Sequence, residues 1–290
     1  MAIRVETEDP GAGDVGDAVE RYKRSFPDYA EAIDLYGAVM KVQQESLPEI
    51  ECTMDFSALD IEKNLREGRS LLDPSQLDIP IQTIRRVLGG ICSEVERQGA
   101  AGSKGCEDLV RWEGLGIEGF QGTRDKLLRG ERLELNRAEE EGAGAEFAAG
   151  IIWESLVPFY RKCARGLQEG IDHALWQKGF CPICGIGPLM GKFRRGDGMW
   201  LLECRLCHTL WNVRRAECPF CSQGVEGSLE YIYLEGHDSY RAYYCSRCKR
   251  YVKNVDLRSA QNDALLPLDN IVTELMGLDR AAEQEGLNPA

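Results

Sequence analysis

The chain divides near residue 180 into a part with helical spacing of apolar residues and a part with strand-like spacing. Apolar residues recur every three to four positions over 147–167, which predicts an amphipathic helix crossed by Pro158. Two further helices are predicted to begin after Pro27 and after Pro80. A final amphipathic helix is predicted over 267–285.

Short segments rich in aromatic and β-branched residues follow residue 180 and predict strands. The predicted strands cover 199–203, 210–213, 229–234, 240–244 and 251–257. Glycine-containing segments at 196–198 and 236–239 predict hairpin turns. A run of helices followed by a run of strands and a last helix indicates the α+β class.

Eight of the 12 cysteines lie within this strand-rich part and form four Cys-x-x-Cys pairs. The pairs are Cys181/Cys184, Cys204/Cys207, Cys218/Cys221 and Cys245/Cys248. A disulfide framework would suit a small secreted domain, but the acidic start of the chain does not resemble a secretion signal. We therefore predict metal binding. Cys92 and Cys163 lie within helical apolar patterns, and we expect both to be small core residues.

The spacing of the pairs predicts two tetrahedral sites of four thiolates each. Cys-Pro-Ile-Cys at 181–184 recurs as Cys-Pro-Phe-Cys at 218–221, which favours a sequential pairing, with one site from the first two pairs and one from the last two. An interleaved pairing stays open. Gly185 is the one glycine that follows a pair, so we expect only this turn to gain its conformational freedom. We expect His208 to be exposed and not a ligand, and His173 and His237 to be structural or solvent-facing.

These patterns predict five segments along the chain. We expect a disordered tail over 1–16, a helical domain over 17–178, a first four-cysteine module over 179–216, a second over 217–258, and a C-terminal helix and tail over 259–290. The acidic stretch 139–144 is predicted to be a loop.

Charge is distributed unevenly between the two parts. Residues 179–258 carry 12 Lys or Arg and 8 Asp or Glu, a net +4, which leaves −17 for the remainder of a chain whose total is −13. Each ion with four thiolates would add −2, so the basic residues have a role as counter-charges even without a partner. The acidic remainder and the lack of a sustained aromatic and basic stripe weigh against nucleic acid as the main partner.

Other function classes lack their sequence features. No apolar run reaches the roughly 18 residues of a membrane-spanning helix, and with no secretion signal we expect a cytoplasmic protein. There is no phosphate-binding glycine loop, nucleophile elbow or histidine-rich open metal site, so we expect no enzymatic activity.

The cysteine motifs resemble the formate dehydrogenase accessory protein family, FdhE. The resemblance is carried by Cys-Pro-Ile-Cys-Gly at 181–185, by Leu-Glu-Cys-Arg-Leu-Cys-His-Thr-Leu-Trp at 202–211, and by the pairs at 217–221 and 244–253. The ending from Leu278 to Pro289 is also similar, whereas the helical half matches in layout more than in motif.

This resemblance implies a cytoplasmic maturation factor with two rubredoxin-like or zinc-ribbon-like modules. It implies binding to the catalytic subunit of a molybdenum- or tungsten-dependent formate dehydrogenase before export. It also favours iron in the two sites, although four thiolates suit zinc equally. Two other functions stay open on the residues alone: a rubredoxin-like electron-transfer or redox-sensing protein, and a nucleic-acid-binding zinc ribbon. A symmetric homodimer through the helical half also stays open.

Overall fold

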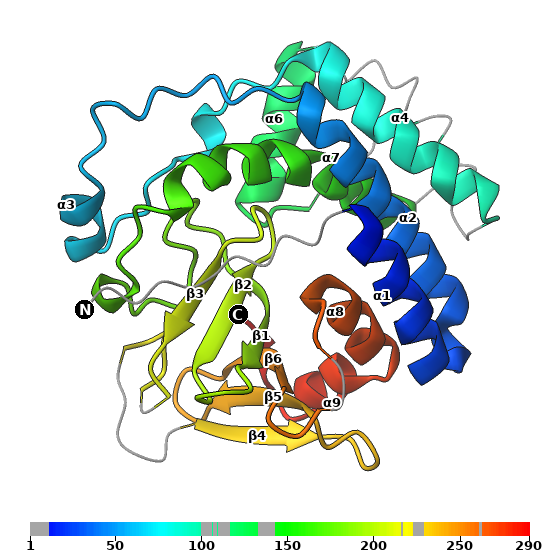
Figure 1. Ribbon diagram of the computed structural model, residues 1–290, viewed down its shortest axis with the longest axis vertical. Helices are drawn as coiled ribbons and strands as arrows, with labels where there is room; N and C mark the ends of the chain where they lie inside the picture. Colours follow the sequence, from blue (N-terminus) through cyan, green and yellow to red (C-terminus); the bar gives the residue numbers. More distant parts are fainter. Residues whose placement is uncertain are drawn as a thin grey trace.

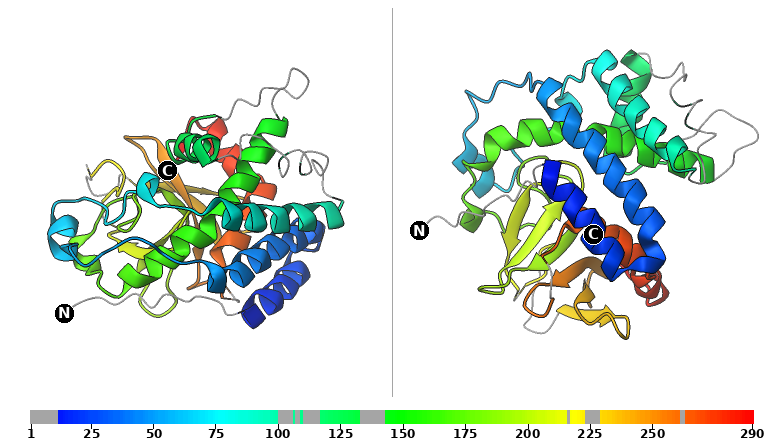
Figure 2. Two further views of the ribbon diagram at one scale, coloured as in Figure 1. Left: turned by 90° about the horizontal axis from the view of Figure 1, so that it is seen from above. Right: turned by 45° about the vertical axis from the view of Figure 1, so that its right-hand side comes forward.

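The computed structural model describes residues 12–99, 106, 109, 117–132, 143–215, 217–222, 229–260 and 263–290. Helices from the first half of the chain lie around one side of a β-sheet, with α8 between the sheet and α2, and α9 against β4 and β5 (Figures 1 and 2). This arrangement agrees with the predicted α+β class. No helix within the described ranges is both long and apolar enough to cross a membrane.

The helices of the first half form because apolar side chains recur along one face of each. In α4, the buried residues Ile84, Val87, Leu88, Ile91 and Val95 follow this spacing. The helices predicted after Pro27, after Pro80 and over 147–167 are confirmed as α2, α4 and α7. The bounds are α1 Ala12–Ser25, α2 Ala30–Ser46, α3 Ile61–Arg66, α4 Ile81–Arg97, α6 Ile117–Leu128 and α7 Ala143–Gln168.

Helix α1 begins inside the segment for which the sequence predicts a disordered tail. That prediction is wrong for 12–16, while residues 1–11 lie outside the described residues. The helix is ordered by packing, since Val15, Ala18 and Tyr22 are buried against α2 and α8. The predicted acidic loop at 139–144 lies outside the described residues up to 142, and α7 begins at Ala143.

The strands of both predicted modules share one sheet, in the order β3-β2-β1-β6-β5-β4, with β7 beside β6. β1 and β6 run parallel and join a β1-β2-β3 unit to a β4-β5-β6 unit, each of which is antiparallel. The sequence missed β1 and the short β7. The bounds are β1 Pro188–Phe193, β2 Trp200–Cys204, β3 Leu210–Val213, β4 Leu229–Tyr233, β5 Tyr240–Cys245, β6 Arg250–Asp256 and β7 Asn288–Pro289.

The C-terminal helix predicted over 267–285 is two helices, α8 Leu266–Leu275 and α9 Leu278–Gln284. The break lies at Gly277, whose φ of 89° is left-handed and ends α8. After the break, Leu278 and Ala282 of α9 pack with Tyr251 and Leu287 on one face of the sheet. The break at Gly277 thus precedes the helix that places Leu278 and Ala282 in the core.

Cys52 and Cys163 form a disulfide, with Cα atoms 5.1 Å apart. The bond ties the segment after α2 to the buried face of α7. The prediction that Cys163 is a core residue is confirmed, since its side chain is 1% exposed, but the sequence did not predict its disulfide. Cys92 is a buried free cysteine, as predicted.

Candidate metal centre

The eight paired cysteines form two clusters, one from the first two pairs and one from the last two. Within each cluster, all four Sγ atoms lie within 4.8 Å of one another. This is the sequential grouping and not the interleaved one. We call the first cluster site one and the second site two: Cys181, Cys184, Cys204 and Cys207; Cys218, Cys221, Cys245 and Cys248.

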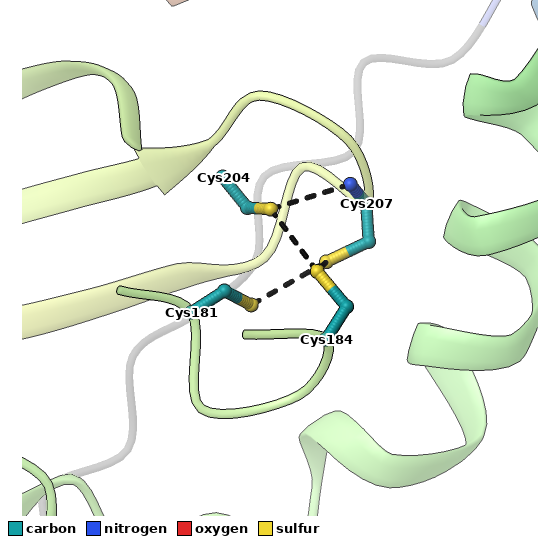
Figure 3. A group of neighbouring side chains, drawn as sticks. All are labelled: Cys181, Cys184, Cys204 and Cys207. Carbon is teal, nitrogen blue, oxygen red and sulfur yellow. Dashed lines mark hydrogen bonds between the residues drawn. The ribbon is translucent and has the colours of Figure 1, made fainter. Parts of the chain in front are cut away.

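In site one, a turn before β1 and a turn between β2 and β3 face each other, so that four side chains point toward a common centre (Figure 3). The Sγ atoms of Cys181 and Cys207 are 3.5 Å apart, those of Cys184 and Cys204 are 3.4 Å apart, and those of Cys184 and Cys207 are 3.6 Å apart. In site two, the Cys218–Cys248 and Cys221–Cys245 distances are 3.8 and 3.9 Å.

These distances fit a four-coordinate metal ion. Metal–sulfur bonds of about 2.3 Å at the corners of a tetrahedron separate the sulfurs by about 3.8 Å. Site two has this spacing and site one is a few tenths of an ångström tighter. Each cluster is therefore able to hold one ion, and the geometry suits iron and zinc alike.

All four turns share one backbone conformation. The residue after each second cysteine has a positive φ: 75° at Gly185, 54° at His208, 51° at Ser222 and 59° at Lys249. Its N–H donates to the carbonyl oxygen of the first cysteine of the pair, at 2.9 to 3.2 Å. Only Gly185 adopts this conformation with the freedom of glycine, as the sequence predicts, but the sequence did not predict that the other three residues adopt it too. Three non-glycine residues accept a strained conformation, because the turn satisfies a backbone donor and brings both thiols to one side.

Site one is buried inside the main hydrophobic core, and none of its cysteines is more than 1% exposed. The backbone N–H groups of Leu71 and Leu72 donate to the carbonyls of Pro182 and Ile183, so the turn is anchored to the helical half. On α7, the Trp153 indole N–H donates to the carbonyl of Arg205 at 3.2 Å. Site one thus fastens the sheet to the helices.

Site two lies nearer the surface. Cys218 and Cys245 are buried, whereas Cys221 and Cys248 are half-buried. Its first turn is joined to the approach of site one, since the N–H of Gly179 donates to the carbonyl of Pro219 at 2.8 Å. We therefore expect an ion in site two to exchange with solvent more readily than one in site one.

The thiols of the two sites differ in acidity. Burial raises the pKa of Cys184 and Cys204, so an ion that binds their thiolates must displace protons. In site two, burial opposes ionisation of Cys245, but hydrogen bonds from the backbone of Cys248 and Arg247 lower its pKa to about 7. Site one also has an acidic thiol, since burial opposes ionisation of Cys207 but hydrogen bonds from the other three cysteines and Thr209 lower its pKa. Each site therefore combines one thiol of lowered pKa with others, such as Cys218 in site two, whose pKa is raised by burial.

The sequence did not predict the polar residues that surround site one. The Oγ1 of Thr209 lies 3.1 Å from Sγ of Cys207 and accepts a hydrogen bond from the Gln168 side chain. His208 is not exposed as expected: its Nδ1 lies 2.6 Å from a carboxylate oxygen of Glu203. The contact between Gln168 and Thr209 joins distant segments, so no spacing in the sequence marks it.

A cavity of about 520 Å³ lies beside site one, between α1, α2 and α7 on one side and the sheet on the other. Cys207 and His208 form part of its wall, with Lys192 of β1 and Glu203 of β2. Both charged side chains are nearly buried, at 8% and 9% exposure. Site one is therefore closest to solvent on the side of this cavity.

The other two histidines belong to neither cluster of thiols. His173 is 4% exposed, and burial lowers its pKa to about 4, which fits the expected structural role. His237 is half-buried in the turn between β4 and β5.

Comparison with known proteins shows which proteins this chain resembles. The family model described as "FdhE, central domain" matches residues 180–215, which contain all four cysteines of site one. The segment that contains site one is therefore similar to the FdhE family. Relatives include the FdhE homologue of Actinobacillus pleuropneumoniae serotype 3, which is 29% identical over 164 residues, and the FdhE protein of Escherichia coli K12, which is 31% identical over 143 residues.

These alignments span about half of each protein. The first covers 54% of this chain and 52% of the relative, and the second covers 48% and 44%. The FdhE homologue of Aquifex aeolicus is 30% identical over 118 residues, or 40% of this chain and 41% of that protein. The crystal structure of FdhE from Pseudomonas aeruginosa aligns over 99% of this chain and 95% of its own, with a TM-score of 0.70 and 20% identity. The FdhE fold therefore extends over the helical half as well as the sheet.

Proposed function

We propose that this chain is a non-enzymatic accessory protein that binds the catalytic subunit of a formate dehydrogenase and supports its maturation. The match of the FdhE central domain to the segment that contains site one carries this proposal. Two clusters of four thiols in one sheet support it, because they are the feature on which the family resemblance rests. The partner and the activity are inferred from relatives of which the alignments cover about half.

We further propose that sites one and two each bind one metal ion through all four cysteines. Four thiolates fill a tetrahedral shell and leave no position for substrate water, so a bound ion supplies a structural crosslink or, if it is iron, a one-electron centre. The family resemblance favours iron. The protein's own contribution is to hold the sulfurs at the required spacing and to join the helical half to the sheet.

The proposed location is the cytoplasm, where an accessory protein would meet the catalytic subunit before export. The Cys52–Cys163 disulfide bears on this location, since disulfides are rare in the cytosol. The oxidation state of this pair in cells therefore tests the proposed compartment. Sedimentation of the purified protein tests the symmetric dimer that the sequence leaves open.

Capture of the partner tests the function. The tagged chain is expressed with the formate dehydrogenase catalytic subunit of the same organism, as wild type and as Cys181→Ser/Cys184→Ser and Cys218→Ser/Cys221→Ser variants. We expect the wild type to capture the subunit and both variants to capture less. Cys92→Ser changes a buried cysteine outside both clusters and should capture as the wild type does. Failure of the wild type to capture the subunit would refute the proposal.

Electron transfer is a second candidate function, and the half-burial of Cys221 and Cys248 favours it. A metal centre near the surface is accessible to a redox partner, whereas site one is enclosed. If the sites bind iron, reduction with dithionite distinguishes the two functions. A pure accessory role predicts equal capture of the subunit in both oxidation states, and a redox role predicts a difference.

A further inference from the structure

Exposed aromatic side chains gather on β4, the edge strand beside site two. Among the residues that the structure describes, three large apolar side chains are strongly exposed: Tyr231 at 46%, Tyr233 at 53% and Leu275 at 47%. The rings of Tyr231 and Tyr233 are 6.2 Å apart, and Tyr231 lies 5.4 Å from Tyr243 of β5. Two of these three exposed side chains therefore belong to one aromatic group.

This group lies on the face of the sheet opposite α9. Tyr231 pairs with Tyr243 and Tyr233 pairs with Arg241, so these four side chains share one face. Their neighbours Ile232 and Tyr244 point to the other face, where they pack with Leu278 and Ala282 of α9. The tyrosines therefore contribute little to that core.

Arginines lie over the same aromatic surface. The guanidinium carbon of Arg241 is 4.5 Å from the ring centre of Tyr231. Arg215 and Arg258 lie 4.7 and 5.1 Å from the ring centre of Phe193, which contacts Tyr243 edge-on at 5.2 Å. We name this set the Tyr–Arg surface: Arg215, Tyr231, Tyr233, Arg241, Tyr243 and Arg258.

The Tyr–Arg surface carries a net positive charge on an acidic protein. Of its three arginines, Arg258 is neutralised by an ion pair with Asp256 at 2.7 Å. Arg241 donates to the carbonyl of Asp238 and to the hydroxyl of Tyr243, which holds its guanidinium plane over Tyr231. A guanidinium over an aromatic ring keeps N–H donors with which it binds a carboxylate.

We propose that the Tyr–Arg surface is where an acidic segment of a partner polypeptide docks. Tyrosine and arginine are the residue types that most often dominate binding energy at protein interfaces. The positive surface and its stacked arginines select carboxylate side chains. The proposal rests on the proposed function, in which the partner is the formate dehydrogenase catalytic subunit. The surface adjoins site two through the Leu229–Cys245 pair, so loss of an ion bound there would disturb its support.

Binding of the purified catalytic subunit to the purified full chain tests this proposal. We expect Tyr231→Ala/Tyr233→Ala and Arg241→Glu each to weaken binding by about tenfold or more. We also expect the wild-type affinity to fall with added salt and that of Arg241→Glu to depend on salt less. Leu275→Ala is the matched control, because Leu275 is equally exposed but lies on α8. Metal content shows that each variant keeps its fold.

The outcomes of this experiment distinguish failure of the proposed docking surface from failure of the proposed function. If the wild type binds and both surface variants bind equally well, the surface is refuted and the proposed function stands. Loss of binding in Leu275→Ala as well would also refute it. If the wild type does not bind the subunit, both proposals fail. If oligothymidylate binds the wild type and not the variants, or if self-association is what the variants abolish, the surface belongs to nucleic acid or to a second copy instead.

Discussion

The indole Nε1 of Trp200 donates a buried hydrogen bond to Oδ1 of Asn254 at 2.6 Å. Trp200 lies on β2 and Asn254 on β6, so the bond crosses β1, which runs between them. It crosses at Gly191, where a Cβ atom would stand 2.1 Å from the same Oδ1. The bond therefore links the two four-cysteine units at the position where β1 has no side chain.

Substitution of Asn254 tests this link. Asn254→Ala leaves the Trp200 N–H buried without its acceptor, and we expect a loss of about 1–3 kcal/mol in the free energy of unfolding. Gly191→Ala should also destabilise, because its methyl group collides with Asn254. In the double variant that collision is absent, so the combined loss should be smaller than the sum of the two. Urea unfolding measures all three, and strict additivity would contradict the contact.

Asp269 predicts a pH dependence of stability. Its carboxylate accepts a hydrogen bond from Tyr240 at 2.7 Å, and burial raises its pKa from 3.8 to about 7. Tyr22, Glu203 and Lys192 also act on it. Because the folded protein holds the proton more tightly than the unfolded chain, this contribution is complete below pH 3.8 and is lost as pH rises through about 7.

Asp269→Asn should remove this pH dependence and unfold at higher urea than the wild type at about pH 8. The wild-type free energy of unfolding should fall by up to roughly 1.4 kcal/mol per pH unit relative to the variant, between about pH 5 and 7. Asp263→Asn is the control, since that side chain is 87% exposed. Parallel pH profiles for wild type and Asp269→Asn would refute the raised pKa.

The Cys52–Cys163 bond predicts a selective protection from alkylation. In denaturant without reductant, Cys92 and Cys106 should react with iodoacetamide, whereas Cys52 and Cys163 should react only after reduction. Cys52→Ala should lower the free energy of unfolding by about 2–5 kcal/mol, since the bond spans 111 residues of chain. Reaction of Cys52 and Cys163 without reductant would show the bond absent.

The sequence predicted the strands and the two thiol clusters well, because each rests on local information. Enrichment in aromatic and β-branched residues predicted β2 to β6, and the repeat of Cys-Pro-x-Cys favoured the sequential grouping that the structure shows. The missed strand β1 contains Pro188 and Gly191, which both lower strand propensity. Gly191 is required there by Asn254, more than sixty residues later in the chain.

The remaining errors come from contacts between distant segments. Nothing near Cys163 in the sequence indicates Cys52, and only the docking of the segment after α2 onto α7 brings the pair together. The helical conformation of α1 likewise depends on packing with Leu268 and Val272 of α8, which are far away in the sequence. The left-handed turns at His208, Ser222 and Lys249 have no sequence marker, because the cysteine pairs impose that conformation on non-glycine residues.

Each cluster of four cysteines is proposed to bind one metal ion, which gives two ions per chain. Elemental analysis of protein purified without oxygen tests it most directly, and a visible absorption spectrum distinguishes iron from zinc. We predict two ions per chain for the wild type and for Cys92→Ser, and one for Cys181→Ser/Cys184→Ser and for Cys218→Ser/Cys221→Ser. A wild type without metal, or paired variants that keep both ions, would contradict it.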